Sequence, residues 1–192
     1  RMNDRLERLP RTGYLLTGVP HPETVAAHAC ATAWLTMVVA GRMVAEGECI
    51  DRARAVEMAL LHETGELVIG DLVPGVSRAL GPGVKEQAEL ACGGRFLDTL
   101  DPDMGELFRE YMAGTTAEAL LVRECDRLAL LLKTAGYRRD GYRGVTSLLS
   151  PDKYTFCNKL CGLIAARVFR ELEAEGFRPD GTEPPWEGPA AE

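Results

Sequence analysis

The chain of 192 residues has no long apolar run and no excess of positive charge. Its longest wholly apolar stretches, such as residues 128–132, fall far short of the roughly 18 residues that span a bilayer, so we expect no membrane partner. The first four residues contain no apolar segment, so we expect no secretory signal. The formal net charge of -7 argues against a nucleic acid polymer as partner, because such binding depends on concentrated Lys and Arg.

The six cysteines include no Cys-x-x-Cys pair and no paired zinc-ribbon spacing. Most of them lie in apolar stretches with helical spacing, where a free thiol behaves as a small hydrophobic group. We therefore expect reduced thiols in the core and, from them, a cytoplasmic location.

The spacing of apolar residues in the sequence is helical. Apolar residues recur every three to four positions, and no stretch of strand length alternates convincingly between apolar and polar residues. This pattern predicts an all-α fold. With 46% hydrophobic and 27% charged residues, one globular bundle of about six to seven helices is expected over residues 1–177. Residues 178–192 are rich in Pro and Gly and are expected to form a mobile tail.

Capping residues place the long helices. Asp51 and Asp101 are expected N-caps, residues 115–118 (TTAE) match a capping box, and Ser150-Pro151 opens the last helix. The helices are expected at residues 23–46, 51–69, 85–100, 102–113, 116–135 and 151–175. The last helix carries an apolar stripe that serves either as core or as a dimer surface.

Three of these helices each carry polar groups in an apolar setting. His28 lies among Ala and Val residues, the apolar run before His62-Glu63 is followed by Glu66, and Asp126 lies between two Leu-rich stretches. An isolated buried charge is costly, and one bound cation could satisfy all of these groups. Imidazole nitrogen with carboxylate oxygen is a ligand set compatible with Mn, Fe, Co, Ni or Zn.

A structural role for each residue stays open on spacing alone. His28 and His62 could be hydrogen-bonded core histidines, and Asp126 could pair with Arg123 or Arg127, one turn or less away.

Five segments of the chain carry a resemblance to a known family. They are residues 9–14 (LPRTGY), 22–28 (PETVAAH), 61–72 (LHETGELVIGDL), 116–118 (TAE) and 122–127 (VRECDR). In order and spacing they resemble the HD-domain metal-dependent phosphohydrolases, and among these the small 5′-deoxynucleotidases. The resemblance runs from Leu6 to about Lys133, and it implies that residues 1–177 form an HD-domain helical bundle.

The resemblance also implies a ligand set. One divalent metal ion (Co, Mn, Fe, Ni, Zn or Mg) would be held by His28, His62, Glu63 and Asp126.

The resemblance further implies roles for five other residues. Glu66 falls at the family's catalytic acidic residue, and Asp71 at the acidic residue of its Gly-Asp pair. Arg11 falls at the residue that contacts the substrate phosphate, Thr12 at one that packs near the nucleoside, and Glu118 at an acidic residue near the sugar.

One position departs from the family pattern. The doublet that names the family is His-Asp, and here it reads His62-Glu63. Glu keeps the carboxylate but moves its oxygen by about an ångström, which is large beside the ~0.5 Å tolerance expected of a site.

Two classes of function follow from these observations. The first is a metal-dependent phosphomonoesterase that converts deoxynucleoside 5′-monophosphates, or a related or modified nucleotide, to nucleoside and phosphate. The second is a non-catalytic HD-like nucleotide-binding or interaction module whose site Glu63 has altered. In either case the expected partner is a small-molecule nucleotide, and the resemblance implies a homodimer.

Overall fold

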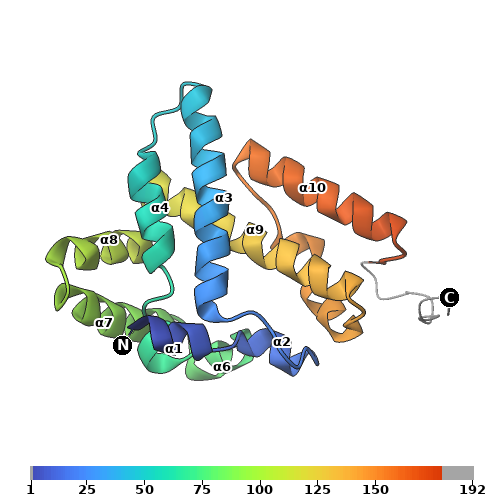
Figure 1. Cartoon of the computed structure of the whole chain (residues 1–192), viewed down its shortest axis with the longest axis horizontal. Helices are drawn as coiled ribbons and strands as arrows, with labels where there is room; N and C mark the ends of the chain where they lie inside the picture. Colours follow the sequence, from blue (N-terminus) through green and yellow to red (C-terminus); the bar gives the residue numbers. More distant parts are fainter. Residues whose placement is uncertain (1, 179–192) are drawn as a thin grey trace.

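The protein, seen here as a computed structural model that describes residues 2–178, is built of helices and their connections, with no β-strand in that range (Figure 1). Its α-helices are α1 (Met2–Arg8), α2 (Thr12–Leu16), α3 (Val25–Ala45), α4 (Arg52–Leu61), α5 (Glu66–Ile69), α6 (Pro74–Leu80), α7 (Val84–Asp98), α8 (Pro102–Ala113), α9 (Ala117–Arg139) and α10 (Lys159–Ala174). Two short 3₁₀ helices, η1 (Arg143–Leu148) and η2 (Pro151–Lys153), precede α10. The predicted all-α fold is therefore confirmed, while residues 179–192 of the expected tail lie outside the described range.

The helix count exceeds the six or seven expected because the additional helices are short. α1, α2, α5 and α6 have four to seven residues each, too few for an apolar period to show in the sequence. Within residues 2–178 no helix is long and apolar enough to cross a membrane.

Three helices, α3, α4 and α9, form the middle of the bundle. α3 and α4 run antiparallel side by side, and α9 crosses behind them (Figure 1). One apolar cluster joins α3, α9 and α10, and a second joins α3 and α4 to α7, α8 and α9. α3 and α9 contribute to both clusters, so residues midway along them lie in the interior between the two halves of the bundle.

The helix starts follow the capping residues. Asp51 and Asp101 each accept a hydrogen bond from a backbone N–H in the first turn of α4 and α8, as predicted. The predicted capping box over residues 115–118 is wrong by one residue, because the N-cap of α9 is Thr116, whose side chain accepts the N–H of Ala119. Glu118 is therefore one position too early to complete a box. Its carboxylate instead accepts the backbone N–H of Asp51 at 2.8 Å, which ties the start of α9 to the start of α4.

The predicted helix over residues 51–69 is interrupted, and that part of the prediction is wrong. α4 ends at Leu61, whose carbonyl accepts both the backbone N–H of Thr64 at 2.9 Å and its hydroxyl at 2.6 Å. The N–H of Glu66 then donates to the carbonyl of Glu63 at 3.0 Å, another bond between residues three apart. Since residues three apart eclipse each other in such a tight turn, Glu63 and Glu66 come to one face.

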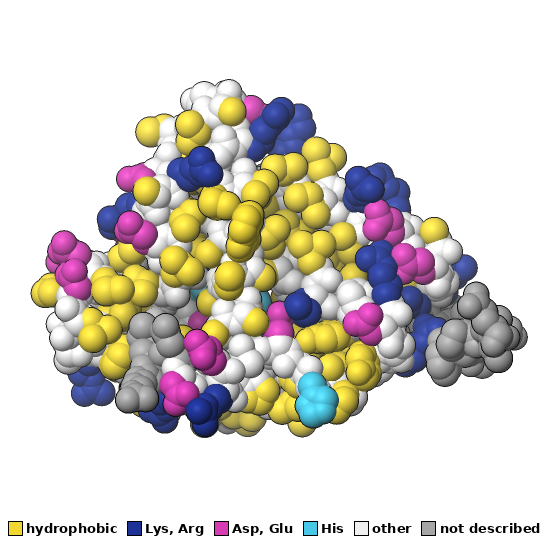
Figure 2. Space-filling view, in the orientation of Figure 1, with side chains coloured by type: hydrophobic (Ala, Val, Ile, Leu, Met, Phe, Trp, Pro, Cys, Tyr) yellow, Lys and Arg dark blue, Asp and Glu magenta, His cyan; other side chains and the backbone are white. Residues whose placement is uncertain are grey.

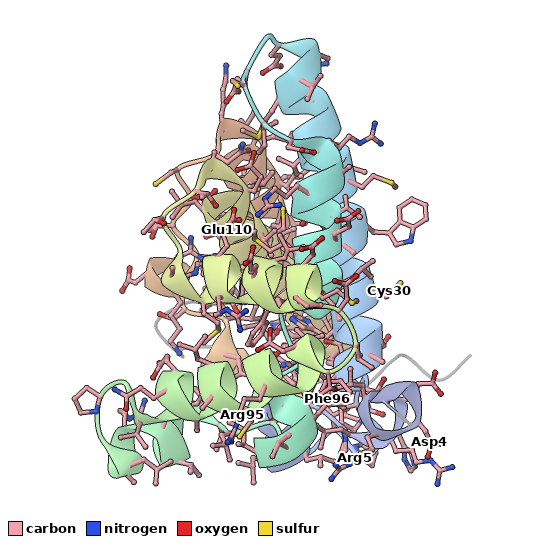
Figure 3. All side chains as sticks on the ribbon, turned by 90° about the vertical axis from the view of Figure 1, so that its left-hand side faces the viewer. Asp4, Arg5, Cys30, Arg95, Phe96 and Glu110 are labelled. Carbon is pink, nitrogen blue, oxygen red and sulfur yellow. The ribbon has the colours of Figure 1, made fainter. Side chains whose placement is uncertain are left out.

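Glycine allows α7 to pack closely against this turn. A Cβ on Gly65 would lie 2.8 Å from Cα of Glu89, and one on Gly93 would lie 2.7 Å from the ring of Phe108. Figure 3 shows α7 and α8 from the side, with Phe96 of α7 close to α1, where it packs on a small apolar cluster of α1, α3 and α5. These close approaches hold α7 beside the end of α4.

The last helix starts later than predicted. Residues 151–153 form only the 3₁₀ helix η2, and α10 is capped by Asn158, whose side chain accepts from two backbone N–H groups. Glu124 of α9 fixes this point, because its carboxylate accepts the N–H of Cys157 at 2.7 Å and of Asn158 at 2.8 Å. The apolar stripe of α10 faces mainly the core, with Leu163 left exposed.

The cysteines are all free, but only two are fully in the core. Cys125 and Cys161 are buried, whereas Cys30, Cys49 and Cys157 are exposed. The expectation that most of the thiols are core groups is therefore wrong, because helical periodicity locates a residue on a helix without deciding which face is covered.

Candidate metal centre

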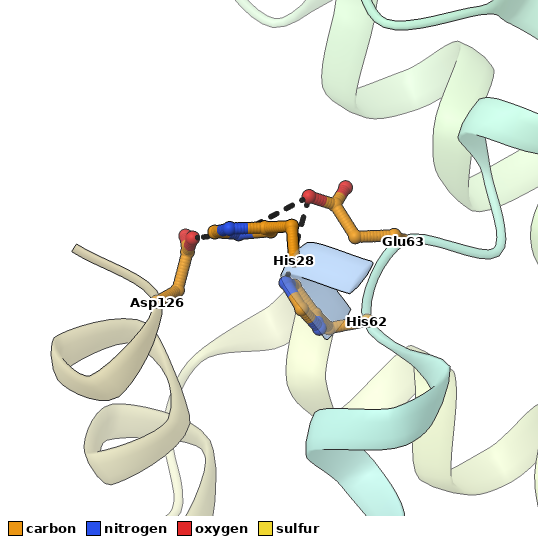
Figure 4. A group of neighbouring side chains, drawn as sticks. All are labelled: His28, His62, Glu63 and Asp126. Carbon is orange, nitrogen blue, oxygen red and sulfur yellow. Dashed lines mark hydrogen bonds and ion pairs between the residues drawn. The ribbon is translucent and has the colours of Figure 1, made fainter. Parts of the chain in front are cut away.

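Four side chains from three helices meet in the interior of the bundle. His28 extends from α3, His62 and Glu63 from the end of α4, and Asp126 from the middle of α9 (Figure 4). One ligand atom of each residue lies within 4.8 Å of those of the other three. The structure thus brings together the four residues proposed from the sequence as metal ligands.

The two imidazoles face the carboxylates through their Nε2 atoms. Nε2 of His28 lies 2.8 Å from Oδ1 of Asp126. Oε1 of Glu63 lies 3.6 Å from Nε2 of His28 and 3.6 Å from Nε2 of His62. All four ligand atoms therefore point to one small region.

The orientation of His62 leaves a lone pair for that region. Its Nδ1–H donates to the carbonyl of Ala59 at 2.7 Å, which makes Nε2 the unprotonated nitrogen of the neutral ring. Nε2 of His62 is buried and has no hydrogen-bond partner. A buried nitrogen without a partner is costly, and a metal ion is a partner that the donor set fits: two imidazole nitrogens and two carboxylate oxygens.

The charges of this region also shift the pKa values of its groups. Burial lowers the pKa of His28, but the hydrogen bond with Asp126 and the nearby carboxylate of Glu23 outweigh it and raise the pKa to about 9. For Asp126, burial raises the pKa, yet the hydrogen bond with His28 and the charge of His62 lower it to about 2. The carboxylate of Asp126 therefore stays ionised at neutral pH, as a ligand must.

Arg11 lies at the edge of the cluster and is held there by its backbone. Its N–H donates to the carbonyl of Glu23 at 3.0 Å, within a short antiparallel bridge that pairs Pro10 with Thr24. Nη1 of Arg11 lies 2.8 Å from Oε1 of Glu63. The same Nη1 lies 3.7 Å from Glu66 and 3.6 Å from Asp71, so one guanidinium faces three carboxylates.

Glu66 and Asp71 are held on the same side. Asp71 accepts the backbone N–H of Thr12, which fixes the loop after Gly70 against the segment that carries Arg11. The side chain of Glu66 is buried, with Oε1 3.6 Å from Nζ of Lys85. Burial, together with the charges of Glu63 and Asp71, raises the pKa of Glu66 to about 9.

A cavity of about 360 Å³ opens over these groups, within the size range of small-molecule sites. Its wall includes the polar residues Arg11, His62, Glu63, Glu66, Asp71, Lys85, Glu86, Glu89, Tyr111, Arg123 and Asp126, and apolar residues of which Leu72, Val73, Met112, Leu130 and Leu148 are examples. The cavity can hold a phosphate near Arg11 and an organic group against the apolar part of its wall.

Three predicted site residues are not on the wall of this cavity, namely Thr12, His28 and Glu118. Glu118 is not among the residues of the cavity wall, and its carboxylate is engaged by the N–H of Asp51. Thr12 is placed beside Arg11 through its bond to Asp71, with Gly13 lining the cavity.

Several functional candidates were missed by the sequence reasoning. Glu23 lies behind His28, and Lys85 and Glu89 of α7 line the cavity. Tyr111 of α8 packs edge-on to His62 at a ring distance of 5.6 Å, and Arg123 is fixed by two carbonyls at the end of α8. The polar residues of α7, α8 and α9 are spaced as in any helix with a solvated face, so their sequence did not mark them as functional. Only Glu23, next to Thr24 in the segment before His28, had a sequence signal for a place near the site.

Comparison with known proteins adds a family to this geometry. The sequence profile of the HD domain family matches residues 3–151. The chain is 29% identical over 139 residues to the 5′-deoxynucleotidase HDDC2 of Bos taurus, a match covering 71% of this chain and 65% of the bovine protein. It is 30% identical over 145 residues to the 5′-deoxynucleotidase HDDC2 of Dictyostelium discoideum, covering 72% of this chain and 75% of that protein. The chain thus spans just under two thirds of the bovine relative.

Solved structures agree with the fold. A conserved hypothetical protein from Pyrococcus furiosus superposes with a TM-score of 0.69 at 30% identity, over 91% of this chain and 94% of the other. A protein from Magnetospirillum magnetotacticum, described as a predicted metal-dependent phosphohydrolase, superposes with a TM-score of 0.62 at 26% identity, over 90% of both chains.

The cluster predicts metal binding that depends on His62. Purified protein loaded with a divalent transition metal and desalted should retain about one ion per chain, as expected for one four-ligand site, and His62→Ala should abolish retention. Elemental analysis measures both. His21→Ala is the matched control, because His21 is exposed and lies outside the cluster. Full retention of metal by His62→Ala would refute the assignment of the site.

Proposed function

Because this chain belongs to the HD domain family, we propose that it is a metal-dependent phosphohydrolase that removes the 5′ phosphate from deoxynucleoside monophosphates or a related nucleotide. The observation that carries the proposal is the buried His28, His62, Glu63 and Asp126 cluster at one cavity with Arg11 and two further carboxylates. The relatives named 5′-deoxynucleotidase support this substrate class.

The metal ligands in this proposal are the four clustered residues. A divalent ion held there would act as a Lewis acid toward a phosphate oxygen and neutralise its charge. Its identity, among Co, Mn, Fe, Ni, Zn and Mg, is set by the two imidazoles and two carboxylates, which favour a transition metal over Mg.

Arg11 is the proposed phosphate clamp. Its fork of N–H donors matches phosphate oxygens better than the single ammonium of Lys does. The ion pairs of Arg11 with Glu63, Glu66 and Asp71 all use Nη1, so Nη2 is left for the substrate. Burial opposes the charge of Arg11, but the three carboxylates raise its pKa above the ordinary value, so the clamp stays charged.

Glu66 and Asp71 are the proposed acid–base groups. Glu66 would orient or deprotonate the attacking water, and Asp71 would position that water or supply a second acid. A pKa of about 9 keeps Glu66 protonated at neutral pH in the metal-free protein, and the positive charge of a bound cation would favour the ionised carboxylate that a base requires. Thr12 is assigned to the nucleoside end because it follows Arg11 and its N–H donates to Asp71, and Glu118 is assigned to the sugar, although neither residue is on the cavity wall.

A homodimer is proposed through the exposed apolar face of α3 and α9, which we call the α3–α9 face and define by Ala27, Cys30, Ala31, Trp34, Leu35 and Leu132. Figure 2 shows hydrophobic side chains gathered over α3, and Trp34 is 63% exposed. A contiguous exposed apolar patch of this kind is typical of a protein–protein contact. A cytoplasmic location is proposed as well, since all six cysteines are free thiols.

The function is tested by a phosphate-release panel over deoxy- and ribonucleoside monophosphates with Mg, Mn, Co, Ni and Zn. Wild-type protein should hydrolyse deoxynucleoside monophosphates. Glu66→Gln should lose about 10²-fold or more in rate, the usual contribution of a general acid–base group, while it keeps its metal. Metal binding without turnover on any nucleotide would favour the non-catalytic binding module, and near wild-type turnover by Glu66→Gln would make Glu66 structural.

Glu63→Asp tests the departure from the family doublet. The longer side chain places Oε1 of Glu63 2.8 Å from Arg11 and 3.6 Å from both imidazoles. In an active site adapted to Glu, Glu63→Asp should preserve hydrolysis or change the preferred metal, because a shorter arm draws the oxygen back and coordination distances tolerate only about 0.2 Å. Metal content and hydrolysis are measured for both proteins side by side. An inactive wild type that Glu63→Asp restores would refute the enzyme assignment.

The dimer is tested by light scattering on the purified chain. Wild type should show the mass of two chains, and Trp34→Glu should shift it to one, because a buried unpaired charge opposes association. Leu100→Glu is the control, since Leu100 is also exposed, at 55%, but lies in the turn between α7 and α8. A monomeric wild type, or a dimer unaffected by Trp34→Glu, would contradict this surface.

A further inference from the structure

Two buried polar atoms without hydrogen-bond partners face each other on the outer side of the cluster of proposed metal ligands. They are Nδ1 of His28 and Oε1 of Glu23, and they lie 3.6 Å apart. The side chain of His28 is fully buried and that of Glu23 is 4% exposed, so bulk water does not compensate either atom. One of these two atoms can donate a hydrogen bond and the other can accept it, so a small decrease in the distance between them would form the bond.

The position of the ring proton of His28 explains why these two atoms face each other. Nε2 of His28 lies 2.8 Å from Asp126 in the present structure. If Nε2 is to serve as a metal ligand it must be unprotonated, so the ring proton has to be on Nδ1. That Nδ1–H then needs a buried acceptor, and Oε1 of Glu23 is the one in reach.

His62 shows the same arrangement with a different acceptor. Its Nδ1–H donates to the carbonyl of Ala59 at 2.7 Å, and its Nε2 faces the cluster. In both imidazoles, therefore, the Nδ1 atom on the side away from the cluster faces an oxygen atom. For His62 the oxygen is a neutral carbonyl, and for His28 it is a carboxylate.

Glu23 is itself held in place from three directions. Its Oε2 lies 3.4 Å from Nζ of Lys133 on α9. Its backbone N–H donates to the hydroxyl of Tyr137 at 2.7 Å, and its carbonyl accepts the N–H of Arg11 at 3.0 Å. Lys133 accounts for Oε2 alone, and an ion pair with Lys133 gives no reason for Oε1 to be buried against His28.

We propose that Glu23 is a positioning residue of the metal centre, whose Oε1 accepts the Nδ1–H of His28 and so fixes the tautomer that presents Nε2 to Glu63 and Asp126. This role rests on the proposed metal site. Outer partners of ligating histidines typically account for 10–100-fold in metal affinity.

Metal affinity of Glu23 variants tests the role directly. Competition of Zn²⁺ or Co²⁺ between the protein and a chromophoric chelator should show binding about 10–100-fold weaker for Glu23→Ala. Glu23→Gln should bind more tightly than Glu23→Ala, because its amide oxygen still accepts the Nδ1–H. Glu110→Gln is the matched control: Glu110 is also a partly buried carboxylate in an ion pair, with Arg54, but is absent from the cavity wall.

Two further measurements separate positioning from folding. In zinc-loaded wild type with ¹⁵N-labelled histidine, NMR should show His28 protonated on Nδ1, with the metal on Nε2. The apo forms of Glu23→Gln and wild type should melt at similar temperatures. Unchanged metal affinity in both Glu23 variants, or a His28 proton on Nε2 in the loaded protein, would overturn the proposal while leaving the metal site intact. A wild type that binds no metal would overturn both.

Discussion

The free-energy cost of burying ionisable groups governs the middle of this bundle. His28 and Glu66 are almost completely removed from water, and Arg11 faces three carboxylates from one position. Such groups are tolerated only when they satisfy one another or share a cation. The geometry of α3, α4 and α9 achieves this, because the polar side chains of the three helices meet with their ligand atoms within 4.8 Å of one another.

Much of this arrangement was predictable because it depends on local rules. Helical periodicity predicted the all-α fold, and the side chains of Asp51 and Asp101 marked true helix starts. His28, His62 and Asp126 were recognisable as polar residues in apolar stretches, and the order of the family motifs indicated that they share one site. Residues whose setting contradicts the local pattern are those that sequence reasoning finds best.

The parts that were missed depend on contacts between distant segments. Asn158 begins α10 because Glu124, more than thirty residues earlier, binds the backbone at that point. α4 stops at Leu61 because the Thr64 side chain and tight backbone bonds replace the helical pattern. The exposure of Cys30 and the role of Glu23 behind His28 are likewise set by which helix lies opposite, and no local periodicity records that.

The Arg11–Glu63 ion pair links the two ends of the cavity. Oε1 of Glu63 faces both Nη1 of Arg11 and the Nε2 atoms of the imidazoles, so a single oxygen is shared between the anion-binding and the cation-binding groups. A cation held by Glu63 would compete with Arg11 for this oxygen, and an anion held by Arg11 would weaken the attraction of Arg11 for Glu63, so each ligand would favour the other. In the language of thermodynamic linkage these are two coupled sites, and because coupling free energies are reciprocal, each ligand raises the affinity for the other by the same factor.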